Sequence, residues 1–364
     1  MRIVHAALFA LLIFFPFGTT YADRLVLVAG GGKGGDGPAK KARLIAPFGV
    51  DFDKHGNMYI VELRGNRVHK VTPKGMLTTI GGTGEKGDSG DGGPAAMATF
   101  NGAHSLAIGP EGHLYIADTW NNRVRRIDLK TKKVTRFAGV PGKKAYGGDG
   151  GPAAKAKFSG IYSIAFNPSK SKMYLADLNN RRVRMVDMKT KIVTTIAGNG
   201  KRGVPTDGAD AKTSPLVDPR AVAADSQGNV YILERSGHAL RVVDSEGKIR
   251  TVVGAGKAGN SGDGGDPRKA RLRGPKHLCI DHDDNVIIAD TANHVIRVYY
   301  PRENKLVRIA GTGKKGFSGK GGEALKVPMS QPHGVTIHKD GTLYIVDSFN
   351  DRVFRLVKET GNRE

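Results

Sequence analysis

The sequence is poor in the features that would build a disulfide-stapled, helical or membrane-spanning protein. Its single cysteine, Cys279, excludes internal disulfides, and its apolar neighbours predict a small buried side chain. Helical periodicity is missing, and no segment after Phe17 is apolar enough to cross a bilayer, which takes about 20 residues. The chain also lacks a nucleophile elbow, a phosphate-binding loop and a helical zinc motif, which excludes the enzyme classes that depend on them.

Acidic residues are scarce relative to basic ones. Lys and Arg number 57 and Asp and Glu number 34, which gives a formal net charge of +23. Such an excess predicts attraction to anionic partners and says little about the fold. The alternative is a cationic surface that only keeps the protein soluble. Both interpretations are open at this point.

The N-terminus has the pattern of an export signal. Met1 and Arg2 precede an apolar stretch at 6–17, and Thr20-Tyr21-Ala22 offers a small-residue cleavage site. We therefore predict a signal peptide over 1–22, a secreted or periplasmic protein, and no transmembrane segment after signal removal. An uncleaved anchor is the alternative, although the apolar stretch is short for one. The rest of the chain is predicted to be a single domain over 23–358 with a polar tail over 359–364.

One phrase recurs along the whole chain and is clearest at 113–128, HLYIADTWNNRVRRID. Its six copies are marked by the second residue of the apolar strand, namely Tyr59, Tyr115, Tyr174, Tyr231, Ile287 and Tyr344. These markers lie 56 to 59 residues apart, which indicates six copies of one structural unit. The second copy contains four strand-like runs, at 105–109, 114–118, 123–128 and 133–139. Four short strands per unit predict an all-β, six-bladed β-propeller of four-stranded antiparallel blades.

The two ends of the repeat array predict how the ring closes. The last repeat stops after its third strand, at 352–358, while the segment 25–35 (LVLVAGGGKGG) resembles the fourth strand at 193–203 (VTTIAGNGKRG). We therefore expect residues 25–29 to pair with residues 352–357 as the outer strand of the last blade. This pairing would remove two exposed sheet edges.

The unit resembles the NHL repeat, a family named for Asn-His-Leu. Asn293-His294-Val295-Ile296 comes near to spelling that motif, and the Gly-Asp-Gly-Gly-Pro-Ala loops at 90–95 and 148–153 resemble those of exported members. The resemblance covers about 24–358. It implies a propeller that serves as a platform for protein, RNA or another ligand, and only occasionally as an enzyme.

Six residues at the start of the innermost strands are expected to meet at one mouth of the central channel. They are Phe48, His104, Tyr162, Arg220, His277 and His333. Three neutral imidazoles could hold a zinc-like divalent metal with an open coordination position. Arg220 could bind a carboxylate and Tyr162 could transfer a proton, which makes these two the candidate catalytic residues. The alternative is that these side chains only hydrogen-bond water and one another.

The mouth is also similar to that of the six-bladed amidating lyases that cleave peptidyl-hydroxyglycine, and this resemblance implies a zinc-dependent lyase. His333, which follows a proline, matches a metal-binding position of that family best, and His104 matches it with Ala103 in place of the proline. His277 is a looser match, and Tyr162 and Arg220 match by role only. The disulfides of that family are absent.

Basic residues recur in the loops between consecutive blades, on the expected mouth face. The candidate ligand-binding residues among them are Lys143, Lys144, Lys201, Arg202, Lys314 and Lys315, and Lys33, Lys86 and Lys257 hold equivalent places. Such a collar of charge would concentrate anions. Phe48 and Trp120 complete the predicted ligand-binding set, because Trp120 could stack on a sugar or peptide. Solvated lysines in glycine-rich turns are the alternative for the collar.

These observations lead to two hypotheses of different classes. The first is an exported propeller, expected to be a monomer, that binds an anionic polysaccharide, peptide or protein at its mouth face. The second is a metal-dependent lyase or hydrolase that uses the three histidines, with Tyr162 and Arg220 beside them. RNA binding fits the charge, but the signal segment and the few aromatic residues argue against nucleic acid.

Overall fold

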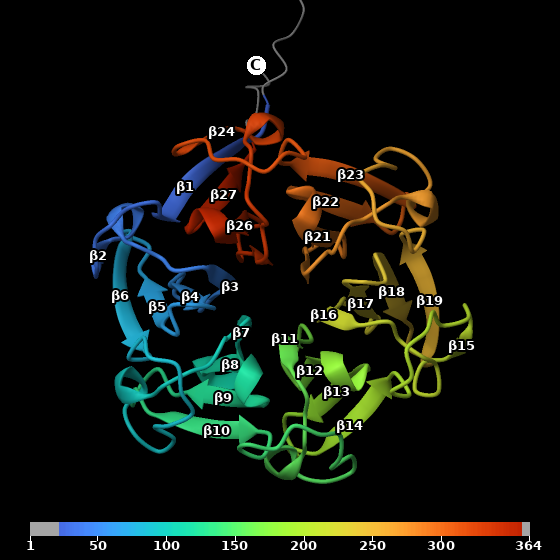
Figure 1. Cartoon of the computed structure of the whole chain (residues 1–364), viewed down its shortest axis with the longest axis horizontal. Coiled ribbons are helices and arrows are strands. Elements are labelled where there is room, and N and C mark those ends of the chain that lie inside the picture. Colours follow the sequence, from blue (N-terminus) through green and yellow to red (C-terminus); the bar gives the residue numbers. More distant parts are fainter. Residues whose placement is uncertain (1–21, 359–364) are drawn as a thin grey trace, which may run out of the picture.

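The computed structural model describes residues 22–358, which form a ring of six antiparallel β-sheets (Figure 1). The six-bladed propeller predicted from the repeat is therefore confirmed. The predicted signal peptide, apart from Ala22, and the predicted tail at 359–364 lie outside the described residues. Among the residues described, no helix is long and apolar enough to cross a membrane.

Each blade runs from an innermost strand beside the channel to an outer strand at the rim. The innermost strands are β3 (Pro47–Phe52), β7 (Ser105–Ile108), β11 (Ile161–Phe166), β16 (Pro219–Ala224), β20 (His277–Ile280) and β25 (Val335–Ile337). The second strands are β4 (Met58–Glu62), β8 (Leu114–Asp118), β12 (Lys172–Asp177), β17 (Val230–Glu234), β21 (Val286–Asp290) and β26 (Leu343–Asp347). The third strands are β5 (Val68–Val71), β9 (Arg123–Ile127), β13 (Arg182–Asp187), β18 (Ala239–Val243), β22 (Val295–Tyr300) and β27 (Arg352–Val357).

The outer strands are β6 (Met76–Gly81), β10 (Val134–Ala138), β14 (Val193–Ala197), β19 (Lys248–Val253), β23 (Lys305–Ala310) and β1 (Arg24–Gly30). Three sheets carry a short fifth strand outside these, namely β2 (Gly37–Pro38), β15 (Ala209–Asp210) and β24 (Gly321–Glu323). The prediction of four strands per blade therefore describes three of the six sheets, and the other three have five.

Short 3-10 turns connect the strands on both faces. Those between second and third strands are η4 (Thr119–Asn121), η6 (Leu178–Asn180), η8 (Thr291–Asn293) and η10 (Ser348–Asn350). Those in the connections between blades are η1 (Ala39–Lys41), η2 (Ala95–Met97), η5 (Ala153–Lys155), η7 (Pro267–Lys269) and η9 (Ala324–Lys326), and η3 (Pro110–Gly112) lies in the hairpin from β7 to β8.

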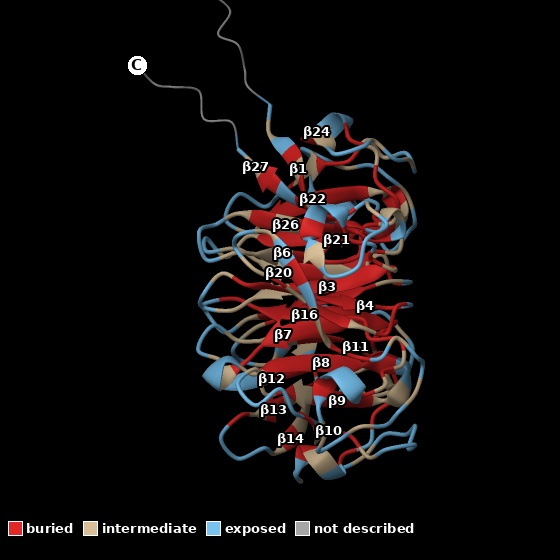
Figure 2. Ribbon diagram, turned by 90° about the vertical axis from the view of Figure 1, so that its left-hand side faces the viewer, coloured by how far each residue is buried: buried red, intermediate tan, exposed pale blue. Residues whose placement is uncertain are grey.

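The hydrophobic core lies between neighbouring blades. In β8 every residue is buried, because both faces of the sheet are covered by adjacent sheets. Tyr115 and Ala117 of β8 pack in one cluster with Ile164 of β11 and Leu175 of β12, and similar clusters repeat around the ring. Figure 2 shows the buried strands between two faces of more exposed loops. A strand buried on both faces reads as a continuous apolar run, which explains the LYIAD-like segments of the sequence.

Strand β1 closes the ring by pairing with β27, as the sequence predicted (Figure 1). The register joins Leu25 to Leu356 and Leu27 to Phe354, and all four of these side chains are buried. A side chain supports the same closure on the mouth face, because Asp351 Oδ1 accepts a hydrogen bond from the backbone N–H of Ala46 at 2.7 Å. First and last blades are thus joined by a sheet and by a side-chain contact.

Candidate functional site: the mouth of the central channel

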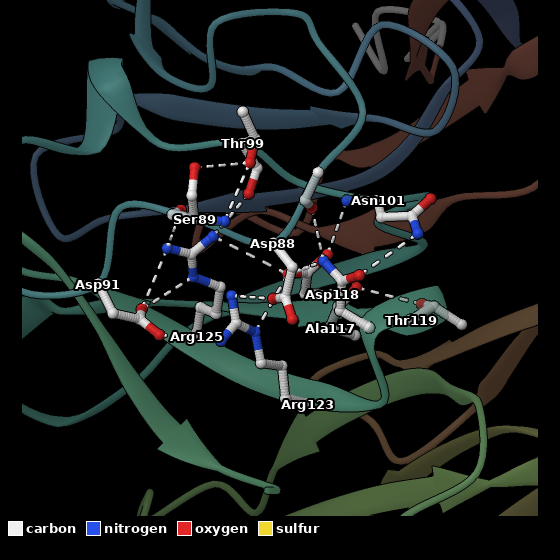
Figure 3. Close-up of polar contacts among 12 residues, drawn as sticks. Asp88, Ser89, Asp91, Thr99, Asn101, Ala117, Asp118, Thr119, Arg123 and Arg125 are labelled. Carbon is white, nitrogen blue, oxygen red and sulfur yellow. Dashed lines mark hydrogen bonds and ion pairs between the residues drawn. The ribbon is translucent and has the colours of Figure 1, made fainter. Parts of the chain in front are cut away.

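Each loop that leads into an innermost strand is held by the acid that ends the second strand of the same blade. In the second blade, Asp118 accepts the backbone N–H of Asn101 at 2.8 Å and the side-chain amide of Asn121 at 2.9 Å (Figure 3). The acids at this position are Glu62, Asp118, Asp177, Glu234, Asp290 and Asp347, and each accepts one such backbone N–H at 2.6 to 2.8 Å. These acids thus fix the loops that form the mouth.

Buried arginines of the third strands complete this scaffold. Arg125 contacts Asp91 at 3.0 Å and donates to the carbonyl oxygens of Thr99 and Ser89, while Arg123 pairs with Asp88, Asp91 and Asp118 (Figure 3). Burial outweighs these contacts at Asp118 and raises the pKa of its carboxyl to about 6. The network ties the glycine-rich loop at 88–91 to the blade, so this aspartate-bearing loop is a structural element.

The pairing of the first residue of the third strand varies between blades. Arg123 and Arg352 contact the acid of their own blade. The corresponding Arg67 and Arg182 instead donate to backbone carbonyls. In five blades the acid pairs with the residue two positions further along the third strand, which points to the same face of the sheet as the first position. These residues are His69, Arg125, Arg184, Arg241 and Arg297.

The structure corrects one of the six mouth positions. The backbone N–H groups of His104 and His333 donate to Ala117 and Val346 of the neighbouring second strand, and in the fifth blade Lys276 makes the equivalent bond to Ala289. The loop before the strand gives the same alignment. Arg273 donates its backbone N–H to Asp290, as Asn101 does to Asp118 in the second blade. Lys276 is the third residue after Arg273, and His104 is the third residue after Asn101. The six mouth residues are therefore Phe48, His104, Tyr162, Arg220, Lys276 and His333. The alignment of the fifth repeat was wrong by one residue.

His277 consequently has a different environment from the other two predicted metal ligands. Its Nδ1 accepts the backbone N–H of Val335 in the next blade at 3.4 Å. Ser105 and Ser163 lie one residue after the mouth position in their own blades. Their hydroxyl oxygens accept the backbone N–H groups of Ile164 and Val222 in the next innermost strand, at 3.3 and 3.4 Å. His277 thus connects two neighbouring blades below the mouth.

Aromatic and imidazole rings fill the mouth on one side. Phe48 is buried and stacks on His333 with the ring centroids 3.8 Å apart, and it meets the edge of His104 at 5.2 Å. His104 in turn contacts Tyr162 at 4.6 Å. The Nδ1 atoms of His104 and His333 donate to the carbonyl oxygens of Gly102 and Gln331. Burial keeps both imidazoles neutral by lowering their pKa values well below the usual value.

This arrangement does not fit the predicted zinc site. The Phe48 ring lies between His104 and His333, and the third mouth position that was expected to be histidine is Lys276. Within 22–358, no group of three or more His, Cys, Asp or Glu side chains is arranged to hold a metal ion. Two imidazoles that flank a phenyl ring cannot supply the three ligands that a catalytic zinc requires.

The other side of the mouth is cationic. Arg220 is buried and lies over the Tyr162 ring, with its guanidinium carbon 4.4 Å from the ring centroid. Burial lowers the pKa of Arg220 to about 9, and burial together with Arg220 and Arg235 lowers the pKa of Lys276 to about 8. Burial and the nearby cations also hold the pKa values of His104 and His333 well below their usual value. The mouth therefore has a high positive potential.

The predicted collar residues are exposed. Their loops are fixed to the mouth face by the asparagines of the 3-10 turns. Asn121, Asn180 and Asn350 donate to the carbonyl oxygens of Gly87, Ala145 and Gly316, each of which directly follows a collar lysine, at 2.8 Å. Trp120, in the turn η4, is 49% exposed and lies 5.8 Å from His104. Phe48, in contrast, is covered by its neighbours.

Comparison with known proteins identifies the repeat. A family model described as the NHL repeat matches residues 100–127. The chain is an NHL-repeat propeller. It is 27% identical over 290 residues to the Arabidopsis thaliana chloroplastic protein SUPPRESSOR OF QUENCHING 1, covering 76% of this chain and 27% of that protein. It is 25% identical to the Gallus gallus NHL repeat-containing protein 2, covering 87% of this chain and 47% of that protein.

Both relatives are longer than this chain. The region that matches this chain covers about a quarter of the Arabidopsis thaliana protein and about half of the Gallus gallus protein. Among solved structures, an auxiliary nutrient binding protein from Bacteroides thetaiotaomicron superposes with a TM-score of 0.67 at 16% identity, covering 93% of this chain and 77% of that chain. At this identity the likeness supports the fold alone.

Two features of the NHL-repeat mouth were missed from the sequence although signals for them exist. Lys276 lies 14 residues before the acid of its blade, as do Phe48, His104, Arg220 and His333 before theirs. Tyr162 lies 15 residues before Asp177, so this count favours Lys276 but does not decide the position. Phe349 occupies the same place in η10 that Trp120 occupies in η4, is 38% exposed, and lies 5.8 Å from His333. Trp120 and Phe349 thus border the mouth as a pair.

Proposed function

We propose that this NHL-repeat propeller binds an anionic ligand at its mouth face and performs no chemistry on it. The observation that carries this proposal is the state of Arg220. The residue is 4% exposed, and within residues 22–358 its side chain makes one hydrogen bond, from Nη1 to the carbonyl oxygen of Tyr162 at 3.3 Å. In the described part of the chain no carboxylate lies within ion-pair distance of it. A buried cation without a counter-charge is unfavourable by several kcal/mol, so a ligand carboxylate, sulfate or phosphate would be favoured there.

Lys276 extends the same anion site. Its amine is partly buried and has no ion-pair partner within residues 22–358. Asp218, whose charge acts on Arg220, is already engaged by Arg235 at 3.1 Å. Two adjacent cations with free donors suit a ligand group that presents two or more oxygens. The pKa of Lys276, near 8, leaves its amine mostly protonated at neutral pH.

The surrounding surface supports a ligand larger than a single ion. The exposed collar would raise the local concentration of a polyanion. Trp120 and Phe349 offer exposed ring faces for a sugar or peptide that reaches from the mouth toward the collar. The predicted export signal would bring this face into contact with acidic polysaccharides or peptides outside the cytoplasm.

The proposal is tested by the binding of dextran sulfate, with unsubstituted dextran as the neutral probe. We expect Arg220→Met to weaken dextran sulfate binding at least tenfold. Because the arginine is buried and unpaired, the same change should leave the unliganded protein as stable as before or more stable. Equal affinity of Arg220→Met and wild-type protein for dextran sulfate, measured by calorimetry, would refute the anion site.

The collar is tested separately by replacing Lys143, Lys144, Lys314 and Lys315 together with glutamine. The matched control replaces four exposed lysines of the turns and strand ends on the opposite face, namely Lys74, Lys133, Lys189 and Lys248. Both variants lose the same net charge, so only the position of that charge differs. We expect the collar variant to bind dextran sulfate at least fivefold more weakly than the control. If both weaken equally, the binding reflects net charge and the collar has no role.

The lyase hypothesis has no observation of this structure in its favour. The side chains at the mouth do not assemble a three-ligand metal site, and Tyr162 is occupied by contacts with His104 and Arg220. No second function is proposed.

A further inference from the structure

The central channel contains a cavity below the mouth residues, open toward the opposite face of the propeller. Its volume is about 560 Å³, and it is lined by the far halves of the innermost strands and the hairpins that follow them. None of the six mouth residues described above lines it, and His277 is its nearest lining residue to the mouth. This volume lies within the roughly 300–1,000 Å³ that accommodates small organic ligands.

The lining combines apolar walls with carboxylates. Phe52, Ile108 and Phe166 contribute apolar surface, together with alanines of the innermost strands. The acids that line the cavity are Asp51, Asp225, Asp281 and Asp284, and the lysine that lines it is Lys170. A protein of net charge +23 therefore has an acidic cavity in its centre.

These four acids differ from the acids of the blades in having no cationic partner. Within 22–358, none of the four lies within ion-pair distance of a lysine or arginine, whereas Asp118, Asp177, Asp290 and Asp347 are each paired with an arginine. The cavity acids instead accept hydrogen bonds from neutral groups. Asp225, for example, accepts from the backbone N–H groups of Gln227 and Asn229. Their negative charge is thus held in place without being neutralised.

Asp51 lies within the innermost strand β3, whereas the other three acids lie in the hairpins that follow innermost strands. It accepts the backbone N–H of Phe52 at 2.8 Å and, across the boundary to the second blade, that of Ile108 at 2.7 Å. Burial nevertheless raises the pKa of its carboxyl above the usual value. A cation placed beside it would recover the solvation that the carboxylate has lost.

We propose that this cavity binds a small organic cation, a primary or quaternary amine on an apolar body. The ammonium group would lie among the carboxylates of Asp51, Asp225 and Asp284, and the apolar body would pack on Phe52 and Phe166, whose ring faces also attract cations. The ligand class is opposite in charge to that of the mouth face, and the site is separate from it. The propeller would then bind two kinds of ligand, one at each end of its channel.

The single cysteine of the chain reports on this site, because Cys279 is partly exposed and lines the cavity. Its thiolate attacks a methanethiosulfonate to form a mixed disulfide with loss of methanesulfinate. The experiment compares the rates at which Cys279 reacts with the cationic 2-aminoethyl reagent and with the anionic 2-sulfonatoethyl reagent. Each rate is divided by the rate of the same reagent with free 2-mercaptoethanol, which corrects for the intrinsic reactivity of the reagent. Burial raises the pKa of the Cys279 thiol and slows both reactions, but the ratio of the two rates reports the charge of the cavity.

We expect the cationic reagent to react at least tenfold faster on this normalised scale. Asp51→Asn and Asp284→Asn should each reduce the preference at least threefold, and the control Glu85→Gln, an exposed acid of a mouth-face loop, should not change it. Equal normalised rates in the wild-type protein, or a preference for the anionic reagent, would overturn the proposal.

A matched series of ligands tests occupancy directly in the full chain. Tryptamine, tryptophol and indole-3-acetate share one ring system and differ mainly in the charge of the side group. We expect tryptamine to slow the modification of Cys279 by an uncharged alkylating reagent at least fivefold at millimolar concentration, and the other two to slow it less than twofold. Equal protection by all three would show an apolar pocket without charge selection. Protection by none would show that the cavity does not admit such ligands, and either result would refute the proposal.

Discussion

Imidazoles of the channel are kept neutral by their surroundings. Burial is the main cause that lowers the pKa values of His104, His277 and His333, and the Arg220 guanidinium contributes to each. In the unfolded chain these groups titrate near 6.5. As the pH falls below that value, the unfolded state takes up protons that the folded state does not. The stability contributed by the neutral imidazoles is therefore complete above pH 6.5 and is lost as the pH falls toward the folded pKa.

His277 offers the sharpest test, because its pKa is lowered to about 4. By linkage, its titration should reduce the free energy of unfolding by about 1.4 kcal/mol between pH 7.5 and pH 5.5. His277→Ser removes this titration and keeps an acceptor for Val335, since serine occupies the equivalent position in two other blades. We expect urea unfolding at both pH values to show that the variant loses about 1.4 kcal/mol less of its free energy of unfolding than wild type. An unchanged pH dependence would mean that His277 has an ordinary pKa.

Among the elements, β1 closes the ring, because this N-terminal strand completes the sixth sheet by pairing with β27. Leu25 of this strand is 1% exposed and belongs to the core cluster between the fifth and sixth blades. Its neighbour Val26 has the same strand environment but a partly exposed side chain. Substitutions at these two positions therefore distinguish the contribution of side-chain burial from the contribution of strand pairing.

We predict that Leu25→Ala lowers the free energy of unfolding by about 2–5 kcal/mol, the range for a buried leucine. Val26→Ala should cost less than half as much, because less apolar area is removed from the core. Chemical denaturation of both variants, compared with wild type, measures the difference. If the two substitutions had equal effects, β1 would not be packed into the closed ring as described.

At the scale of the whole molecule, the charge distribution separates the two ends of the channel. The mouth carries the unpaired Arg220 and Lys276 and the exposed collar, whereas the cavity below it carries four carboxylates without cationic partners among the described residues. The buried ring residues between them, including Phe48 and His333, keep the two regions apart. One rigid ring can therefore present potentials of opposite sign at its two ends.

This charge distribution predicts that the affinity of the mouth face for dextran sulfate depends strongly on salt concentration. Raising the NaCl concentration from 50 to 200 mM should weaken dextran sulfate binding by about tenfold or more, because exposed lysines interact with the polymer through screened charges. The collar variant should show a smaller decrease than the lysine control on the opposite face. Calorimetric titrations at three salt concentrations measure this. A decrease of the same size in both variants would contradict the assignment of the collar to the mouth.

The fold and its closure could be read from the sequence because both follow from local patterns. Apolar second strands ending in an acid recur in every unit, and the missing fourth strand of the last unit is found at 25–29. The pairing partners of the blade acids could not all be read in this way. Arg67 and Arg123 share a repeat position but meet a backbone carbonyl in one blade and three carboxylates in the other. The partner of each arginine depends on the loop packed outside its sheet, since Asp88 and Asp91 of that loop supply two of the carboxylates that Arg123 contacts.

The sequence by itself determined the number of blades, the strand that closes the ring and the loops that carry the collar lysines. Only the tertiary structure decided which side chain occupies the mouth in the fifth blade, because a slip of one residue turns a β-strand side chain to the other face and a repeat period does not resolve such a slip. With the register of the structure, Lys276 lies beside Arg220 at the mouth, and His277 accepts a hydrogen bond from Val335 of the next blade. The acidic cavity was also beyond the sequence, since Asp51, Asp225 and Asp281 belong to different repeats and meet only around a shared axis.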